Sequence, residues 1–330
     1  MPMKPPGEFE LIERLCRDLP YGRRTLLGPG DDCAIIAPTR RPQLFTIDSM
    51  VEGVHFNLDW INPVQLGARA LTVNLSDIAA MGGWPRWCVI NLGIRTGLDA
   101  RFFDRLYRGL GRAARIAEVG VVGGNITRSA QLTLTIALLG EVATGALRRD
   151  TARQNDDIYV TGTLGDSALG WRIMAGEFQA QGAARKYLVG RFVAPQARLT
   201  AGQRLSRIGP APAAIDISDG LLADLGHILE RSRVGAEVDL AAVPRSRHYL
   251  AVAGDRMDLA LSGGEDYELL FCLPAGSHSP QTLSRRLGIA VHRIGRIVNR
   301  GRGLRLRGAD GRLIPAAGPR GWDQLGSEGR

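Results

Sequence analysis

Acidic residues gather in five short segments of this chain, close to glycine or at the end of an apolar run. Carboxylate oxygens are the ligands that hard divalent cations prefer, and glycine lets a ligand approach the backbone closely. The chain as a whole is basic, so the acidity is local, and the pattern indicates Mg²⁺-assisted chemistry on phosphates. We call these segments the acidic cassettes: GPGDD (28–32), FTIDSM (45–50), NLSDIAAMGG (74–83), DISDG (216–220) and SGGEDYELL (262–270).

The first two cassettes offer adjacent or strand-end carboxylates. Asp31 and Asp32 follow Gly-Pro-Gly and could coordinate a cation, or they could be solvated acids of a Pro-Gly turn. Asp48 follows the apolar run 44–47. His55 comes shortly after it and could touch a phosphate or a ring, although a lone histidine is more often a satisfied polar residue.

Asp77 lies on the apolar stripe of a helix that we expect over 63–81. Ala70, Val73 and Met81 share this stripe at helical spacing, and such a stripe normally faces the core. A buried aspartate needs a cation or a cluster of hydrogen-bond donors. The alternative is that the helix breaks at Asn74 and that Ser76 or Asp77 caps a second helix.

The cassette at 216–220 is the strongest of the five. A strand over 213–217 would place Asp216 and Ser218 on one face, and Asp219 would lie in the turn before a helix over 221–232. The N-terminus of a helix favours anions. The alternative is an aspartate N-cap beside one surface aspartate.

Three further segments could contact phosphate or metal. Gly123 and Gly124 end an expected strand and could expose backbone N–H groups to a phosphate, or they could mark a turn. The arginines at 148, 149 and 153 could neutralise phosphates or could simply be solvated. Glu265 and Asp266 follow a glycine turn, where acids are usually at the surface.

Several common catalytic designs are absent from the sequence. It contains no GxxxxGK[ST] loop, no protein-kinase HRD or DFG set and no GxSxG elbow. The five histidines and four cysteines form no zinc-binding pattern. Phosphate binding therefore has to use another design.

Composition describes an ordinary globular chain of 330 residues that is 45% hydrophobic and carries a net charge of +9. The arginine-rich stretch 293–307 has no interleaved aromatic residues, so we expect solvated arginines there rather than nucleic-acid binding; a strand at 304–307 would lie at a sheet edge. Isolated cysteines, the lack of an apolar N-terminal signal and the lack of a long apolar run predict a cytoplasmic protein without a membrane span.

The elements that must position the cassettes alternate between strands and helices, which predicts an α/β or α+β fold with mixed sheets. Helices are expected over 8–19, 63–81, 100–119, 196–208 and 221–232, and after 166. Strands are expected at 34–37, 44–47, 87–94, near 121, and at 132–142, 158–161, 213–217, 236–240, 259–261, 269–273 and 291–297. The polar, arginine-rich segment 143–156 is the expected domain boundary.

Eight motifs follow one another along the chain. They are GEFELI (7–12), GPGDD (28–32), TIDSMVEGVHF (46–56), NLSDIAAMGG (74–83), VGGNIT (122–127), VTGTLGDSALG (160–170), DISDGL (216–221) and SGGEDYELLF (262–271). In this order and spacing they resemble the motifs of thiamine-monophosphate kinases, from about residue 7 to about residue 325. Relatives in the PurM-like (aminoimidazole ribonucleotide synthetase) superfamily share the glycine and aspartate pattern but not VEGVHF with NLSDIAAMG.

The resemblance implies direct in-line transfer of the ATP γ-phosphate to thiamine monophosphate, assisted by several Mg²⁺ ions. It also implies a PurM-like fold, in which an N-terminal domain (1–148) forms a β-barrel across a homodimer and a C-terminal domain (149–330) completes each site. The implied metal ligands are Asp31, Thr46, Ile47, Asp48, Asp77, Asn125, Asp216 and Asp219, with Asp77, Asp216 and Asp219 also catalytic. The implied ATP contacts are Tyr107, Gly124, Asn125, Arg149 and Ser218, and the implied thiamine monophosphate contacts are His55, Glu265 and Trp322.

One motif departs from the family pattern, because VGGNIT places Asn125 where VGGDT is usual. An amide offers an oxygen but no charge, so we expect one Mg²⁺ position to bind more weakly. The alternatives are another PurM-like ATP-dependent synthetase, a nucleotide-binding sensor that has lost catalysis, and an RNA-binding protein that uses the 293–307 arginines.

Overall fold

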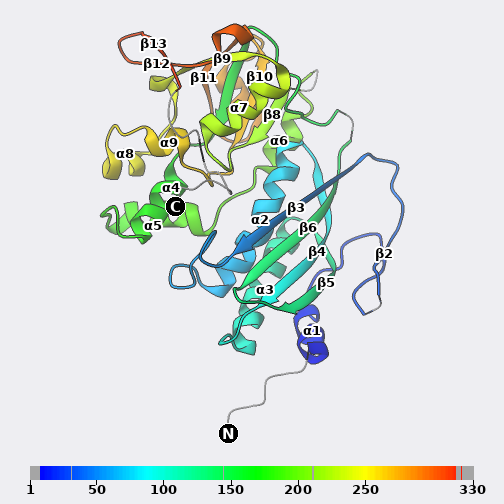
Figure 1. The fold of residues 1–330 in the computed structure, drawn as a ribbon. Helices are drawn as coiled ribbons and strands as arrows, with labels where there is room; N and C mark the ends of the chain where they lie inside the picture. The colour runs from blue at the N-terminus through cyan, green and yellow to red at the C-terminus, as the bar shows by residue number, and fades with distance from the viewer. Residues whose placement is uncertain (1–7, 31, 144, 210–211, 317–320, 322–330) are drawn as a thin grey trace. The chain divides into compact units, whose positions relative to one another are not determined.

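The computed structural model describes residues 8–30, 32–143, 145–209, 212–316 and 321 (Figure 1). The chain forms two compact units. Unit 1 comprises Met1–Ile78 and Trp84–Thr144, and unit 2 comprises Ala79–Gly83 and Gly145–Arg330. Both units combine helices with sheets, which confirms the mixed α/β class predicted from the sequence.

Unit 1 is built on a four-stranded sheet whose strand order is β3-β6-β4-β5. Strands β3 and β4 run antiparallel to β6, whereas β5 runs parallel to β4. A two-stranded β1-β2 pair stands outside this sheet. In chain order the elements are α1 (Glu8–Cys16), β1 (Thr25–Leu27), β2 (Ile35–Ile36), β3 (Gln43–Val51), α2 (Pro63–Ala80), β4 (Trp84–Ile94), α3 (Ala100–Ile116), β5 (Gly120–Arg128) and β6 (Thr133–Glu141).

Helices α2 and α3 cover one face of this sheet (Figure 1). They approach so closely that a Cβ on Gly67 would lie 1.9 Å from the Leu106 carbonyl oxygen, and one on Gly109 would lie 1.9 Å from that of Val64. Glycine is therefore required on both helices at the crossing. The covered face carries the fully buried apolar side chains Ile90, Leu92, Leu134, Ile136 and Leu138.

The opposite face of the unit 1 sheet is open and partly apolar. Phe45 is 70% exposed, Ile47 59% and Val89 43%. The end strands β3 and β5 do not pair with each other, so within the described residues the sheet is an open layer and not a closed barrel.

Unit 2 is built on a seven-stranded sheet whose order is β13-β12-β9-β11-β7-β10-β8. All its neighbouring strands are antiparallel except β9 and β12. The elements are β7 (Asp156–Thr161), α4 (Asp166–Met174), α5 (Gly182–Val193), α6 (Leu199–Leu205), β8 (Ala213–Asp216), α7 (Leu221–Ser232), β9 (Gly235–Asp239), η1 (Leu240–Ala242), α8 (Arg247–Ala253), α9 (Asp258–Ser262), β10 (Leu269–Pro274), α10 (Pro280–Leu287), β11 (Val291–Val298), η2 (Arg300–Arg302), β12 (Leu304–Arg307) and β13 (Leu313–Pro315).

The unit 2 sheet is covered on both faces. On β7, Ile158 and Val160 join one apolar core, whereas Tyr159 between them joins another. Strand β10 alternates in the same way, with Leu270 in the first core and Phe271 in the second. A central strand buried on both faces gives the continuous apolar runs seen at both places in the sequence.

Three local expectations from the sequence are wrong, and one alternative is excluded. Residues 259–261 belong to the helix α9 and not to a strand, because so short an apolar run cannot distinguish a period of 2 from one of 3.6. Helix α2 is continuous past Asn74, so Asp77 caps no second helix. Gly123 and Gly124 lie inside β5 rather than at its end. Strand β12 lies between β9 and β13 and is therefore not an edge strand.

Among the residues with described structure, no helix combines the length and the apolar character needed to cross a bilayer.

Candidate active site

In unit 1, the second and third cassettes meet where α2 passes β3. The Thr46 hydroxyl donates to Asp77 Oδ2 at 2.5 Å, and the Asp48 backbone N–H donates to Asn74 Oδ1 at 3.1 Å. The amide of Asn74 also donates to the Ala70 carbonyl one turn earlier, at 3.1 Å, which fixes its orientation. Thr46 and Asp77 are half-buried and Asp48 is exposed, so oxygen ligands are presented together at this edge of the sheet.

His55 lies in the turn after β3, and its side chain is oriented by the backbone. Its Nδ1 accepts a hydrogen bond from the Val51 N–H at 3.1 Å. Because Nδ1 is an acceptor, the ring proton of the neutral histidine is on Nε2. That atom is a donor suited to a phosphate oxygen. Ile47, which points away from α2 on the open face, could offer a metal only its backbone.

Gly124 and Asn125 lie on β5, at the opposite edge of the sheet from β3. A Cβ on Gly124 would lie 2.3 Å from the Ile90 carbonyl oxygen, so the close pairing of β4 and β5 requires glycine there. The Asn125 Nδ2 donates to Asn91 Oδ1 at 3.0 Å, directly across the strand pair. This contact directs the Asn125 Oδ1 away from Asn91.

Tyr107 lies on α3, and the thiols of Cys16 and Cys88 influence its hydroxyl electrostatically. Burial, together with these two thiols, raises the pKa of Tyr107 well above its ordinary value. Its assignment to nucleotide binding stays a prediction. Arg149 is exposed, and its backbone carbonyl accepts from the Ser232 hydroxyl at 2.8 Å. Asp31 and Trp322, which the sequence predicted as a metal ligand and a substrate contact, lie outside the described residues.

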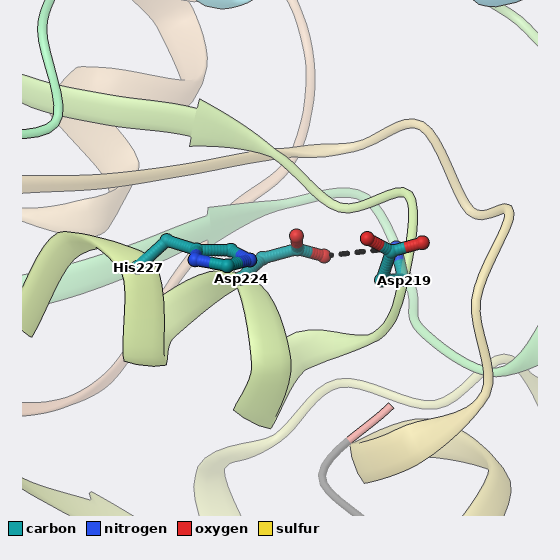
Figure 2. A group of neighbouring side chains, drawn as sticks. All are labelled: Asp219, Asp224 and His227. Atoms are coloured by element: carbon teal, nitrogen blue, oxygen red, sulfur yellow. Dashed lines mark hydrogen bonds between the residues drawn. The ribbon is translucent and has the colours of Figure 1, made fainter. Parts of the chain in front are cut away.

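In unit 2, the fourth cassette begins at the last residue of β8, Asp216, and ends at the start of α7. Three consecutive backbone N–H groups, those of Ser218, Asp219 and Gly220, donate to one oxygen, Asp224 Oδ2, each at 3.1 Å. Figure 2 shows the Asp224 carboxylate reaching back from α7 to Asp219. The sequence predicted that the N-terminus of α7 favours anions, and the N–H groups just before it bind a carboxylate of the chain itself.

Negative charge is concentrated around this turn. One ligand atom from each of Asp219, Asp224 and His227 lies within 4.8 Å of the others. Asp224 is 2% exposed. Burial, and then the charges of Asp216 and Asp219, raise the pKa of Asp224 to about 8. A divalent cation bound by Asp216 and Asp219 would offset this repulsion.

The fifth cassette is hydrogen-bonded to the fourth. The Glu265 N–H donates to the Ser218 carbonyl at 2.7 Å, and the Tyr267 N–H donates to that of Ile217 at 2.8 Å. Glu265 and Tyr267 have φ of 69° and 52°, in the left-handed region that costs free energy for residues other than glycine. Gly264 must be a glycine, because a Cβ there would lie 2.3 Å from the Ser218 carbonyl oxygen.

Buried carboxylates on either side of Tyr267 hold this strained turn. Asp266 Oδ2 accepts from the Gly165 N–H at 2.6 Å, and its other oxygen accepts from the Ser167 N–H at 3.2 Å. Glu268 is fully buried and accepts from Thr161 Oγ1 at 2.7 Å, Arg198 Nε at 2.7 Å and Arg191 Nη2 at 2.9 Å. Acids in such a turn are usually at the surface unless a ligand is nearby, but Glu265 and Asp266 are 7% and 1% exposed.

Comparison with known proteins identifies the family. Models for the AIR synthase related protein family match residues 30–142 with the N-terminal domain and residues 153–305 with the C-terminal domain. The thiamine-monophosphate kinase of Salmonella typhimurium is 40% identical over 274 residues, which cover 81% of this chain and 83% of that enzyme. The chain belongs to the thiamine-monophosphate kinase family.

Solved structures of this kinase family share the fold. The thiamine-monophosphate kinase of Stenotrophomonas maltophilia K279a superposes with a TM-score of 0.82 at 37% identity, covering 93% of this chain and 98% of that one. The complex of AaThiL with AMPPCP and TMP superposes with a TM-score of 0.76 at 33% identity, covering 97% of each chain.

Sequence reasoning missed three residues that orient parts of the candidate site, namely Asn74, Asn91 and Asp224. Asn74 lies inside a recognised motif. Asp224 lies in the first turn of an expected helix, where a carboxylate often accepts hydrogen bonds from backbone N–H groups. Asn91 could not be paired with Asn125 without the strand register. The local pattern therefore offered a signal for two of the three.

Glu268 is the residue whose loss should most affect the stability of unit 2. Glu268→Ala leaves Arg191 and Arg198 without their shared buried carboxylate, so we expect the free energy of unfolding to fall by about 3–5 kcal/mol. Chemical denaturation measures this loss. The control is Asp258→Asn in the solvent-exposed Arg256–Asp258 pair, which should cost less than about 1 kcal/mol. Equal losses in both variants would contradict the anchoring role of Glu268.

Proposed function

We propose that this chain phosphorylates thiamine monophosphate, using ATP, to give thiamine diphosphate and ADP. Identity to the curated kinases over most of the chain is the observation that carries the proposal. The complex of a relative with AMPPCP and TMP supports ATP as the co-substrate. The acidic cassettes fit this reaction, because two polyphosphates must be brought together against their mutual repulsion.

The donors present in each unit fit Mg²⁺, which prefers hard oxygen ligands. Thr46, Asp48 and Asp77 would hold it in unit 1, and Asp216 and Asp219 in unit 2. Burial, and only then the charges of Asp216 and Asp219, raise the pKa of Asp224, and a cation in unit 2 would offset the second of these two causes. Bound Mg²⁺ supplies charge neutralisation for the phosphate oxygens and for the transition state.

The substrate itself supplies the nucleophile, a terminal phosphate oxygen of thiamine monophosphate, so no covalent enzyme intermediate is required. That oxygen is already ionised at neutral pH and needs no general base. The chain's task is to orient the two molecules in line, which can contribute roughly 7–11 kcal/mol. We assign His55 and Glu265 to thiamine monophosphate, and Gly124, Asn125, Ser218, Arg149 and Tyr107 to ATP. Asp31 and Trp322 complete the proposed metal and substrate contacts.

The decisive experiment is incubation of the purified chain with ATP, Mg²⁺ and thiamine monophosphate, followed by chromatography of the products. We expect equal amounts of thiamine diphosphate and ADP, and no thiamine diphosphate after chelation with EDTA. A PurM-like synthetase for another metabolite would leave thiamine monophosphate unchanged. A sensor would bind ATP without forming product, and either outcome would refute the proposal.

The metal assignment predicts that Asp77→Asn and Asp219→Asn each lower kcat while leaving the fold intact. We expect losses greater than roughly 10–100-fold, the effect usual for residues one step removed from a metal. Steady-state kinetics at limiting Mg²⁺, with circular dichroism as the folding check, measures them. Asp104→Asn and Asp258→Asn make the same change outside the cassettes and should leave kcat unaltered. Near-normal turnover in both cassette variants would refute the assignment.

We also infer that the active form is a homodimer that closes the open sheet of unit 1 into a barrel. The strand register places Gly124 level with Asp48, three strand spacings away across the sheet. Neighbouring strands lie about 4.8 Å apart, so the two residues are about 14 Å apart. That distance is too long for Asp48 and Asn125 of one copy to share a cation. A second copy would bring its Asn125 to Asp48 and cover the exposed apolar residues.

The dimer proposal predicts that a charge on the open face disrupts association. Phe45→Arg should convert the dimer to a monomer in sedimentation velocity experiments, because the arginine would be buried without a partner. Ile116→Arg is the matched control, since Ile116 is 77% exposed at the end of α3. A wild-type chain that sediments as a monomer at micromolar concentration would contradict the proposal.

We propose a cytoplasmic location and no nucleic-acid partner. The four cysteines, Cys16, Cys33, Cys88 and Cys272, are all free, as suits a reducing compartment. Several arginines of the 293–307 stretch contact carboxylates, for example Arg302 and Arg307 with Glu237. This pairing supports a structural role for them.

A further inference from the structure

The turn before α7 has the geometry of an anion-binding site. Three successive N–H groups that point to one place form a concave nest, which in many proteins holds a phosphate of a ligand. Here the N–H groups of Ser218, Asp219 and Gly220 converge on Asp224 Oδ2 at 3.1 Å each. The occupant of the nest is therefore a side chain in the first turn of α7, four to six residues further along the chain.

The occupied nest determines what this turn can bind. Asp224 is almost fully buried, and displacing its carboxylate would leave the three N–H groups without their acceptor. Asp216 and Asp219 add their own negative charge beside it. A turn whose N–H groups are already used and whose side chains are acidic repels phosphate and attracts cations.

We propose that Asp224 is a positioning residue that fills the anion nest at 218–220 and thereby makes this cassette a cation site. The carboxylate fixes the backbone of the turn, so that Asp216 and Asp219 are held ready for a divalent ion. It also excludes direct binding of a phosphate to the backbone N–H groups of the turn, which leaves the Ser218 side chain for its proposed contact with ATP. The inference rests on the proposed Mg²⁺-assisted kinase function and adds a residue that contacts neither substrate.

The first test uses the metal alone. Mn²⁺ binding to the nucleotide-free protein is measured by electron paramagnetic resonance for the wild type, Asp224→Ala and Asp224→Asn. We expect the Mn²⁺ affinity to fall by roughly 10–100-fold in Asp224→Ala, as for other residues that orient a metal ligand. Asp224→Asn retains an acceptor oxygen but loses the charge, so its loss should be smaller and still measurable.

The second test uses inorganic phosphate and detects a gain that general damage to the fold would not produce. With EDTA present, Asp224→Ala leaves three converging N–H groups unoccupied, and we expect millimolar phosphate to broaden its ³¹P resonance. The wild type and Asp224→Asn should show no such broadening. The control is Asp99→Ala, which removes another helix-capping carboxylate, the acceptor of the Phe102 N–H, far along the sequence from the 216–220 cassette. Asp99→Ala should lower the melting temperature but should not broaden the ³¹P resonance.

These outcomes separate the inference from the kinase proposal. Phosphate binding to metal-free Asp224→Ala supports the inference even if no thiamine diphosphate is formed by the wild type. A folded Asp224→Ala with wild-type Mn²⁺ affinity and no phosphate binding overturns it. If Asp224→Ala does not fold, unchanged Mn²⁺ affinity in Asp224→Asn overturns it equally.

Discussion

Repulsion between carboxylates is the constraint around which the candidate site is built. Acids that are gathered for metal binding destabilise the protein until a cation arrives, so each must be held by donors of the chain. Thr46 donates to Asp77, three backbone N–H groups donate to Asp224, and the start of α4 donates to Asp266. These donors let oxygen ligands stay together in both units.

The same donors link the cassettes to one another within each unit. Asn74 joins α2 to the backbone of β3, and the two hydrogen bonds from Glu265 and Tyr267 join the fifth cassette to the fourth. Backbone strain at Glu265 is tolerated because Asp266 and Glu268 are fixed on either side of Tyr267. Segments far apart in the sequence therefore keep fixed positions relative to each other inside a unit.

Much of this organisation was predictable from the sequence, and the exceptions have physical causes. Helix α7 was predicted with its observed bounds, because a glycine precedes it and its apolar spacing is regular. The family and its reaction followed from the order of the motifs. Segment 259–261 was misassigned because three apolar residues carry no periodicity. The burial of Glu265 was missed because its neighbours come from distant strands and helices, which a local pattern cannot reveal.

The nest at 218–220 was missed for a related reason. A sequence shows that a glycine and two acids precede a helix, but not which acceptor the backbone N–H groups choose. The observed acceptor is a carboxylate of the chain itself, Asp224. Only the direction of a side chain in space reveals that choice.

The hydrogen-bonded amides of Asn125 and Asn91 determine how the charge at the β5 edge of the sheet depends on pH. Amides do not titrate, so neither side chain gains or loses a proton between mildly acidic and alkaline solution. An aspartate at position 125 would lose its negative charge on strong acidification and would then bind a neighbouring group less tightly. Positions 91 and 125 instead carry no charge at any physiological pH.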